Sequence, residues 1–199
     1  MSILADQVFR SFDTRQVGIV EFAESDEFCN KPLYPRQRVL LKIMFLEELE
    51  GWEEDIVTEW LTDGEARISP GIRERMQFLR ENGYKHFPEI QLVGGRRSSK
   101  GYVTSLAVGK KMYDTWKLGD PGSYYNIDPD KEIYFMCLAT ALDQAKAYQY
   151  ADLVSVITRC KALSEYIGKV QEETFTLKTS ADDQYLMQMK MKGIKVGRD

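Results

Sequence analysis

The stretch "IQLVGGRRSSKGYVTSLA", residues 90–107, places an apolar run before a basic, glycine-containing loop and then returns to helical spacing. A strand-to-helix loop binds phosphate because it points backbone N–H groups and the positive end of the helix at the anion. The usual spelling is G-x-x-x-x-G-K-[ST]. Gly94 and Lys100 have this separation, but Ser99 replaces the second glycine and Gly101 replaces the hydroxyl residue that holds Mg²⁺. The alternative interpretation is an exposed basic turn.

Several residues of this loop are candidate ligands for a nucleoside triphosphate and its Mg²⁺. Ser99 is small enough for phosphate to approach closely, although it adopts positive φ less readily than glycine. The hydroxyl that replaces the usual Mg²⁺ ligand is left open among Ser98, Ser99 and Thr104. The predicted nucleotide-binding residues of the loop are Gly94, Gly95, Ser98, Ser99, Lys100 and Gly101.

The sequence around the loop predicts a parallel α/β core. "HFPEIQLVGG" (86–95) is expected to be a strand, and "EIYFMCLAT" (132–140) is expected to be a second strand buried on both faces. Helical spacing follows each of them, through 102–116 and 143–167, with Leu153, Val156, Ile157, Cys160 and Leu163 expected to face inward. The order strand, helix, strand, helix favours a parallel sheet flanked by helices. The tail is expected to hold a short strand at Phe175 and Leu177 and a Met-rich helix ending at Gly193.

The preceding part of the chain reads as a helical lead-in. "PRQRVLLKIMFLEEL" (35–49), "WEEDIVTEWL" (52–61) and "SPGIRERMQFLRENGY" (69–84) each repeat apolar residues at helical spacing. The last of these opens with Ser-Pro and stops at Asn-Gly. We therefore expect a mainly helical segment at 1–85 and a partial P-loop core at 86–199.

A second element upstream of the loop is consistent with nucleotide binding. "LYPRQR" (33–38) puts Gln37 at the start of a helix, where its amide has both the donor and the acceptor needed to recognise an adenine edge. Tyr34 is a possible stacking partner for the base. Taken alone, Gln37 is more simply a helix-start residue, and only its pairing with the loop makes it a candidate adenine ligand.

These motifs together resemble the large terminase subunit of tailed bacteriophages, the ATP-driven motor that moves double-stranded DNA into a procapsid. The resemblance rests on "LYPRQRVLLK" as the adenine-binding Q motif, "GGRRSSKGYVTSLA" as the phosphate loop, and "EIYFMCLAT" followed by "DQA", and it spans roughly 28–160. It implies a RecA/ASCE-like P-loop fold, ATP and Mg²⁺ as cofactors, and Lys100 with Arg96 or Arg97 as catalytic residues, an arginine sensing the γ-phosphate. The implied partners are double-stranded DNA, portal protein and the small terminase subunit, in a homo-oligomeric ring in the host cytoplasm.

One part of the family pattern is missing from the sequence. Such an ATPase needs an apolar strand ending in Asp-Glu, which supplies the acid that holds Mg²⁺ and the glutamate that orients the attacking water. The run at 132–140 leads to Asp143, but Gln144 follows it, and the acidic cluster of a nuclease is absent as well. We therefore expect an N-terminal part of such a subunit, incomplete at its C-terminus, that binds ATP weakly and hydrolyses little of it.

Composition excludes several other classes of protein. The formal charge of −4 argues against a protein that coats DNA nonspecifically, although residues 1–90 sum to −7 and residues 91–199 to +3. Cys29, Cys137 and Cys160 are far apart in sequence and, with the single His86, do not have the spacing of a zinc site. The sequence has no apolar run of membrane-spanning length and no signal-peptide pattern, so we expect a cytoplasmic protein without a membrane partner.

Two rival functions remain open from the sequence. One is another helicase-like P-loop ATPase that shares the Q motif and the strand order. The other is a non-catalytic nucleotide- or anion-binding adaptor, whose acidic helical half would bind a partner. Adenine preference, and its loss in Gln37→Ala, would separate an ATPase from the adaptor.

Overall fold

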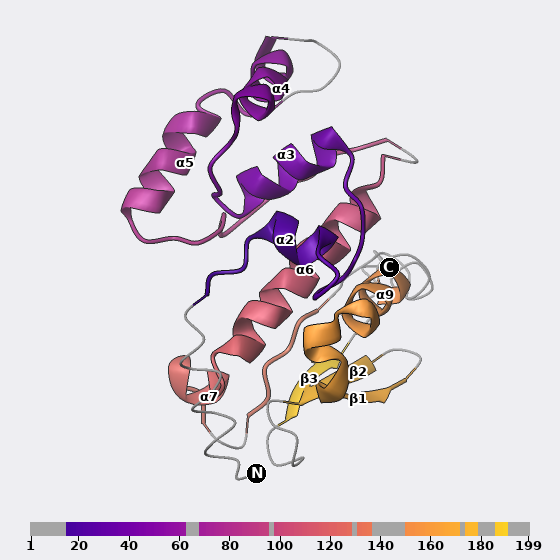
Figure 1. Ribbon diagram of the computed structural model, residues 1–199. Helices are drawn as coiled ribbons and strands as arrows, with labels where there is room; N and C mark the ends of the chain where they lie inside the picture. The colour runs from indigo at the N-terminus through magenta and orange to yellow at the C-terminus, as the bar shows by residue number, and fades with distance from the viewer. Residues whose placement is uncertain are drawn as a thin grey trace, which may run out of the picture.

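The computed structural model describes residues 15–62, 68–95, 98–128, 131–136, 150–171, 174–178 and 186–190. Helices predominate in these ranges (Figure 1). The helices are α2 (Ile19–Glu24), α3 (Pro35–Met44), α4 (Gly51–Thr62), α5 (Ile72–Glu81), α6 (Lys100–Lys117), α7 (Pro121–Tyr124), α9 (Ala151–Arg159) and the 3-10 helix η2 (Lys161–Tyr166). The strands are β1 (Ile167–Val170), β2 (Thr174–Lys178) and β3 (Leu186–Lys190).

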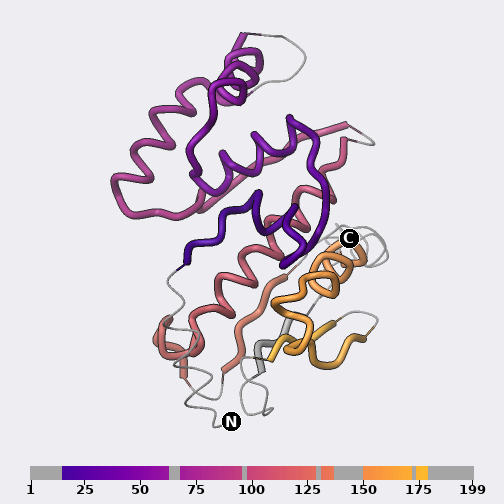
Figure 2. Tube along the Cα trace, in the orientation of Figure 1, coloured from indigo at the N-terminus to yellow at the C-terminus, as the bar shows by residue number. Residues whose placement is uncertain are grey.

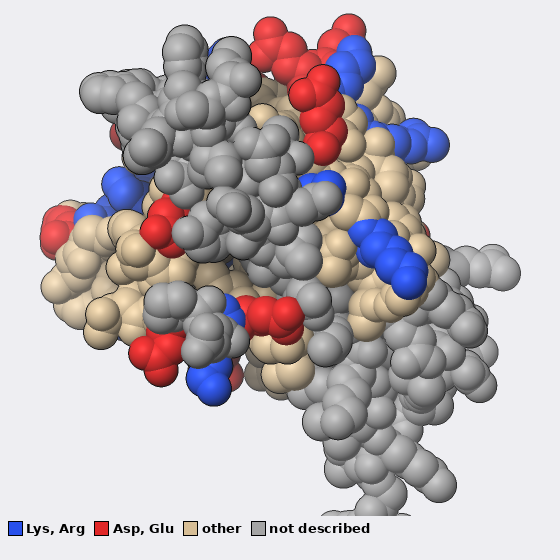
Figure 3. Space-filling model, turned by 90° about the horizontal axis from the view of Figure 1, so that it is seen from below, with Lys and Arg blue, Asp and Glu red and all other residues tan. Residues whose placement is uncertain are grey.

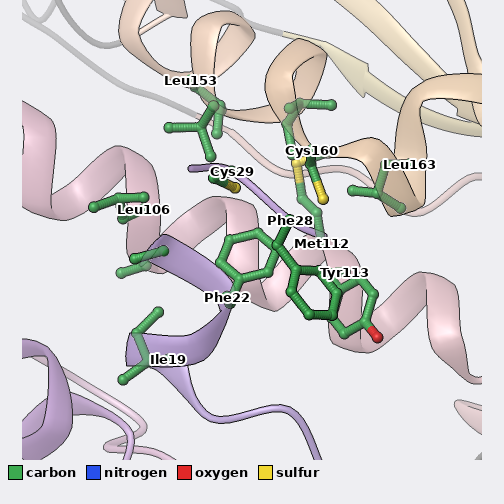
Figure 4. Packing of buried hydrophobic residues seen from close by; sticks show 14 of the residues in the cluster. Ile19, Phe22, Phe28, Cys29, Leu106, Met112, Tyr113, Leu153, Cys160 and Leu163 are labelled. Carbon is green, nitrogen blue, oxygen red and sulfur yellow. The ribbon is translucent and has the colours of Figure 1, made fainter. Parts of the chain in front are cut away.

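Helix α6 is the longest described helix and the centre of the larger hydrophobic core. Helix α2 packs on it from one side, and α9 lies between it and the small sheet (Figures 1 and 2). The rings of Phe22, Phe28 and Tyr113 are in mutual contact, with centroids 5.3–5.9 Å apart (Figure 4). All five residues predicted to face inward from the last helical segment, residues 153 to 163, are buried in this core. The core therefore joins α2, near the N-terminus, to α6, α9 and β2.

A second, smaller core is formed by α3, α4 and α5, as the helical spacing predicted. It contains Val39, Ile43, Leu46, Val57, Trp60, Ile72, Met76 and Leu79. Half-buried Leu40 packs against both cores. The predicted boundary at residue 85 stays a prediction, and the larger core takes residues from both sides of it.

The expected parallel sheet does not appear among the described residues. The sheet there is antiparallel, in the order β1-β2-β3, with Phe175 opposite Met189 and Leu177 opposite Met187. Residues 89–95 form no strand, and Val93 is 87% exposed. Residues 131–136 form no strand either, while 137–140 lie outside the described residues. The prediction failed because a strand needs a hydrogen-bonded neighbour, and a short apolar run does not indicate whether one exists.

The C-terminal part differs from the sequence prediction in two further places. The strand expected at Phe175 and Leu177 is confirmed as β2, but the expected Met-rich helix contains strand β3. "LMQMK" (186–190) pairs with β2 over its whole length, so pairing with a preformed strand outweighs local helix preference there. Of the long helix expected at 143–167, residues 143–149 lie outside the described residues, and α9 and η2, separated at Cys160, form most of the rest.

Two cysteines that are distant in sequence meet in the larger core. Cys29 follows α2 and Cys160 caps α9; both are buried and free (Figure 4). A hydrogen bond between the two thiols, together with burial, raises the pKa of Cys29. The contact between the two thiols could not be read from the spacing of the cysteines in the sequence.

Gly109 allows α6 and α9 to approach closely, and we expect Gly109→Val to destabilise the protein. A Cβ at this position would lie 2.7 Å from Cγ1 of Val156 and 3.6 Å from Cδ1 of Ile157. Overpacking of this kind costs about 2 kcal/mol of unfolding free energy, measurable by urea denaturation. Gly51→Val is the matched control, because an added Cβ there meets nothing within 4 Å. Equal losses in both variants would contradict the close approach at Gly109.

Candidate phosphate-binding site

The loop predicted to bind phosphate lies at the start of α6, and its described residues are exposed except for half-buried Gly101. Helix α6 begins at Lys100, and the first turn closes with the Val103 N–H donating to the Ser99 carbonyl at 3.0 Å. Three backbone N–H groups at such a helix start have no carbonyl partner within the helix, which favours an anion there. Arg96 and Arg97 lie outside the described residues.

Lys100 folds back over its own loop. Its Nζ donates hydrogen bonds to the carbonyls of Gly94 and Gly95, each at 3.0 Å. Both ends of the predicted loop are therefore joined by one ammonium group. The same ammonium group can instead bind a phosphate. It then exchanges two neutral carbonyl acceptors for charged phosphate oxygens, which make stronger hydrogen bonds.

Gly94 makes the tight fold of the loop possible. A Cβ at this position would lie 2.5 Å from Oγ of Ser98, closer than real Cβ contacts. A side chain at residue 94 would therefore require the Ser98 hydroxyl to turn away. The glycine at the start of the predicted pattern has a steric reason in the structure.

Ser99 has the left-handed backbone conformation that the usual glycine would adopt. Its φ is 57° and its ψ is 17°, a backbone conformation that glycine adopts at little cost. For a residue with a side chain this conformation costs about 1 kcal/mol. The sequence irregularity is therefore accommodated as local strain.

We expect Ser99→Gly to raise the free energy of unfolding by about 0.5 kcal/mol, because relief of that strain exceeds the entropy that glycine loses on folding. Ser99→Val should lower it, since a β-branched residue tolerates positive φ poorly. Ser98→Gly is the control, because Ser98 has no positive φ, and it should be mildly destabilising. Urea denaturation measures all three. A stability loss in Ser99→Gly as large as that in Ser98→Gly would contradict the left-handed conformation.

Thr104 does not bring its hydroxyl to the loop, where a hydroxyl was expected to replace the usual Mg²⁺ ligand. Its Oγ1 donates to the carbonyls of Lys100 and Gly101, at 2.8 and 3.0 Å, within the first turn of α6. Ser98 and Ser99 are exposed in the loop itself. The assignment of a metal ligand among these three hydroxyls stays a prediction.

The structure brings the predicted adenine ligands to the same end of α6 as the loop. Tyr102, two residues after Lys100, donates from its hydroxyl to the Pro32 carbonyl at 2.8 Å. Tyr34, two residues after Pro32 in the sequence, is 75% exposed. Gln37 accepts a hydrogen bond from the Tyr34 N–H through Oε1 at 3.0 Å, so it also caps α3, as the simpler interpretation had it.

An acid that the sequence reading missed lies beside this helix start. Asp152, in the first turn of α9, has its Oδ2 3.1 Å from where a Cβ on Gly101 would stand. Lys31 is close by, with its Nζ donating to Oγ of Ser155 at 3.2 Å. Burial and then the charge of Arg159 lower the pKa of Lys31, while Asp152 raises it. The loop therefore has a mixed electrostatic surrounding rather than a purely basic one.

Charges are mixed on a larger scale as well. On the face seen in Figure 3, described Lys and Arg side chains stand separately among Asp and Glu. The described residues contain no group of three or more His, Cys, Asp or Glu arranged to hold a metal ion. None of the helices in the described ranges is long and apolar enough to cross a membrane.

Comparison with known families identifies a P-loop domain. A family model described as "Uncharacterized protein MJ0330, N-terminal P-loop domain" matches residues 2–192. The chain belongs to this family. No curated protein and no solved structure matches it.

Membership of this P-loop family makes the chain a nucleotide-binding domain of the general NTPase type. It supports the prediction of a nucleotide-binding P-loop domain, but it does not extend to the large terminase subunit, and the assignment of the P-loop to residues 94–101 stays a prediction. Such domains typically bind their nucleotide together with a divalent metal. Asp143, the acid considered from the sequence, lies outside the described residues.

Proposed function

We propose that the loop 94–101 binds the phosphates of ATP, with Lys100 as the principal side-chain ligand. The observation that carries the proposal is the double hydrogen bond from Lys100 Nζ to the carbonyls of Gly94 and Gly95. It fixes the ammonium against the loop, and Lys100 is also the first residue of α6, where the N–H groups of the first turn begin. Positioned charge and backbone donors at one point are what a triphosphate requires.

The adenine is proposed to lie beside the start of α3. Exposed Tyr34 offers a ring for stacking, and the Gln37 side chain lies at the same helix start. The hydrogen bond from Tyr102 to the Pro32 carbonyl supports this placement, because it ties this segment to the first turn of α6. Arg96 or Arg97 is proposed to contact the γ-phosphate.

At the level of the whole protein, we propose the ATP-binding part of a motor of the large-terminase type. Its support is the combination of the Q-motif-like "LYPRQR" with the arginine-containing loop. Double-stranded DNA, a portal protein and a small subunit are the partners proposed with it. Hydrolysis by the chain is expected to be slow, because the sequence has no apolar run ending in Asp-Glu.

Titration of the full chain with fluorescent analogues of ATP and GTP tests the nucleotide proposal. We expect saturable binding with a preference for ATP, and Gln37→Ala should remove the preference while leaving phosphate binding in place. An adaptor that only binds anions would show equal affinity for both nucleotides and no response to Gln37→Ala. Absence of saturable binding would contradict the proposal.

A further inference from the structure

Gly101 leaves a space at the loop that a carboxylate occupies. In the usual pattern this position carries the hydroxyl residue that holds Mg²⁺. Here a Cβ at Gly101 would lie 3.1 Å from Oδ2 of Asp152, so that carboxylate lies directly beside the position where the hydroxyl residue would start. Helix α6 therefore lacks the hydroxyl ligand at residue 101, and α9 places a carboxylate oxygen of Asp152 beside the same residue.

We propose that Asp152 replaces the missing hydroxyl and contributes to binding the divalent cation that accompanies the nucleotide. This inference rests on the proposed ATP site. Carboxylate oxygens are preferred ligands of Mg²⁺, which is usually bound by one or two carboxylates together with phosphate oxygens. A single carboxylate from the chain is sufficient when the triphosphate supplies the remaining charge.

The surroundings of Asp152 fit such a role. Its side chain is exposed, and no described residue forms a hydrogen bond or an ion pair with it. Lys31 acts on it electrostatically without a direct contact. A carboxylate this close to bound phosphates would repel them, so a cation between the two removes a repulsion as well as adding an attraction.

Packing fixes the position of this carboxylate relative to the loop. Leu153, its neighbour in sequence, is buried in the larger core. One turn further along α9, Val156 packs directly over Gly109 of α6. The carboxylate is therefore carried by a helix held against α6, and not by a mobile loop.

The test compares the affinity of the full chain for a fluorescent ATP analogue in Mg²⁺ and in EDTA. We expect wild type to bind more tightly in Mg²⁺, and Asp152→Asn to lose about tenfold or more of that enhancement, the range seen when support of a metal ligand is removed. In EDTA the variant should bind at least as tightly as wild type, because the repulsion is gone. Asp128→Asn, an exposed acid elsewhere, is the control and should behave as wild type.

A rescue variant and a direct metal signal make the test independent of hydrolysis. Gly101→Ser combined with Asp152→Ala supplies the usual hydroxyl without the contact at residue 152, and we expect it to show a larger Mg²⁺ enhancement than Asp152→Ala alone. Water proton relaxation with Mn²⁺ and ATP should report a bound ternary complex in wild type and its loss in Asp152→Asn.

The outcomes separate this inference from the function on which it rests. If wild type binds no ATP in either condition, the proposed function fails and this inference fails with it. If wild type binds ATP but shows no enhancement by Mg²⁺, or if Asp152→Asn keeps the full enhancement, only the role of Asp152 is overturned. If Asp152→Asn binds the ATP analogue more tightly than wild type by the same factor in Mg²⁺ and in EDTA, the carboxylate merely repels phosphate. That result also overturns the role of Asp152.

Discussion

Lys100→Met is expected to weaken ATP binding by roughly 30- to 150-fold in Kd. Lys100 Nζ now bonds to the neutral carbonyls of Gly94 and Gly95, and with ATP bound it would bond to charged phosphate oxygens instead. A hydrogen bond to a charged group contributes about 2–3 kcal/mol, and each 1.4 kcal/mol corresponds to about tenfold in Kd. Titration with the fluorescent analogue measures the loss.

Two further variants decide whether the contribution of Lys100 to ATP affinity depends on the position of its ammonium group or only on its charge. Lys131→Met removes an exposed lysine outside the loop and should leave Kd unchanged. Lys100→Arg keeps the charge but not the compact ammonium that fits between the two carbonyls, so it should restore little of the affinity. Full affinity in Lys100→Arg would favour the rival interpretation, an exposed basic turn that attracts anions without a defined geometry.

The helical part of the fold could be predicted because its signals are local. Helix α3 begins at Pro35, α5 ends before Asn82-Gly83, and their apolar residues repeat with the period of a helix. The sheet could not be predicted in this way. Residues 90–93 have the composition of a buried strand, yet no strand among the described residues pairs with them. The segment of β3 was predicted to be a helix, because the spacing of its residues does not show that β2 pairs with it.

The sequence predicted the residues of the candidate site that are close together in the chain, but not the residue that is distant in sequence and close in space. The distance from Gly94 to Lys100 is a sequence property, so the loop could be found despite the changes at Ser99 and Gly101. Asp152 is brought to the loop by the packing of two helices. The available signal was Gly101, Ser105 and Gly109 on α6, small residues four apart that permit close approach of another helix. That spacing predicts a neighbour without identifying it.

The helical segment that carries Gln37 depends on a buried ion pair, and we expect Lys42→Met to lower the free energy of unfolding by about 3 kcal/mol. Nζ of Lys42 lies 2.7 Å from Oε2 of Glu53, which also accepts the Glu50 N–H at 2.8 Å. Lys42 is 8% exposed and Glu53 is fully buried. Without the lysine the carboxylate keeps the hydrogen bond from the Glu50 N–H and, among the described residues, one distant cation, Arg38, whose Nε is 3.9 Å from Oε1, so most of its charge is left uncompensated.

The double variant Lys42→Met/Glu53→Met distinguishes an uncompensated charge from lost packing. Replacing both partners removes the charge altogether, and such replacements are often neutral in stability, so the double variant should be more stable than Lys42→Met alone. Arg36→Met breaks the exposed pair with Glu59 and should cost less than about 1 kcal/mol. Urea denaturation compares the three. A double variant as unstable as Lys42→Met would mean that α3 and α4 are held by the shape of these side chains and not by their charges.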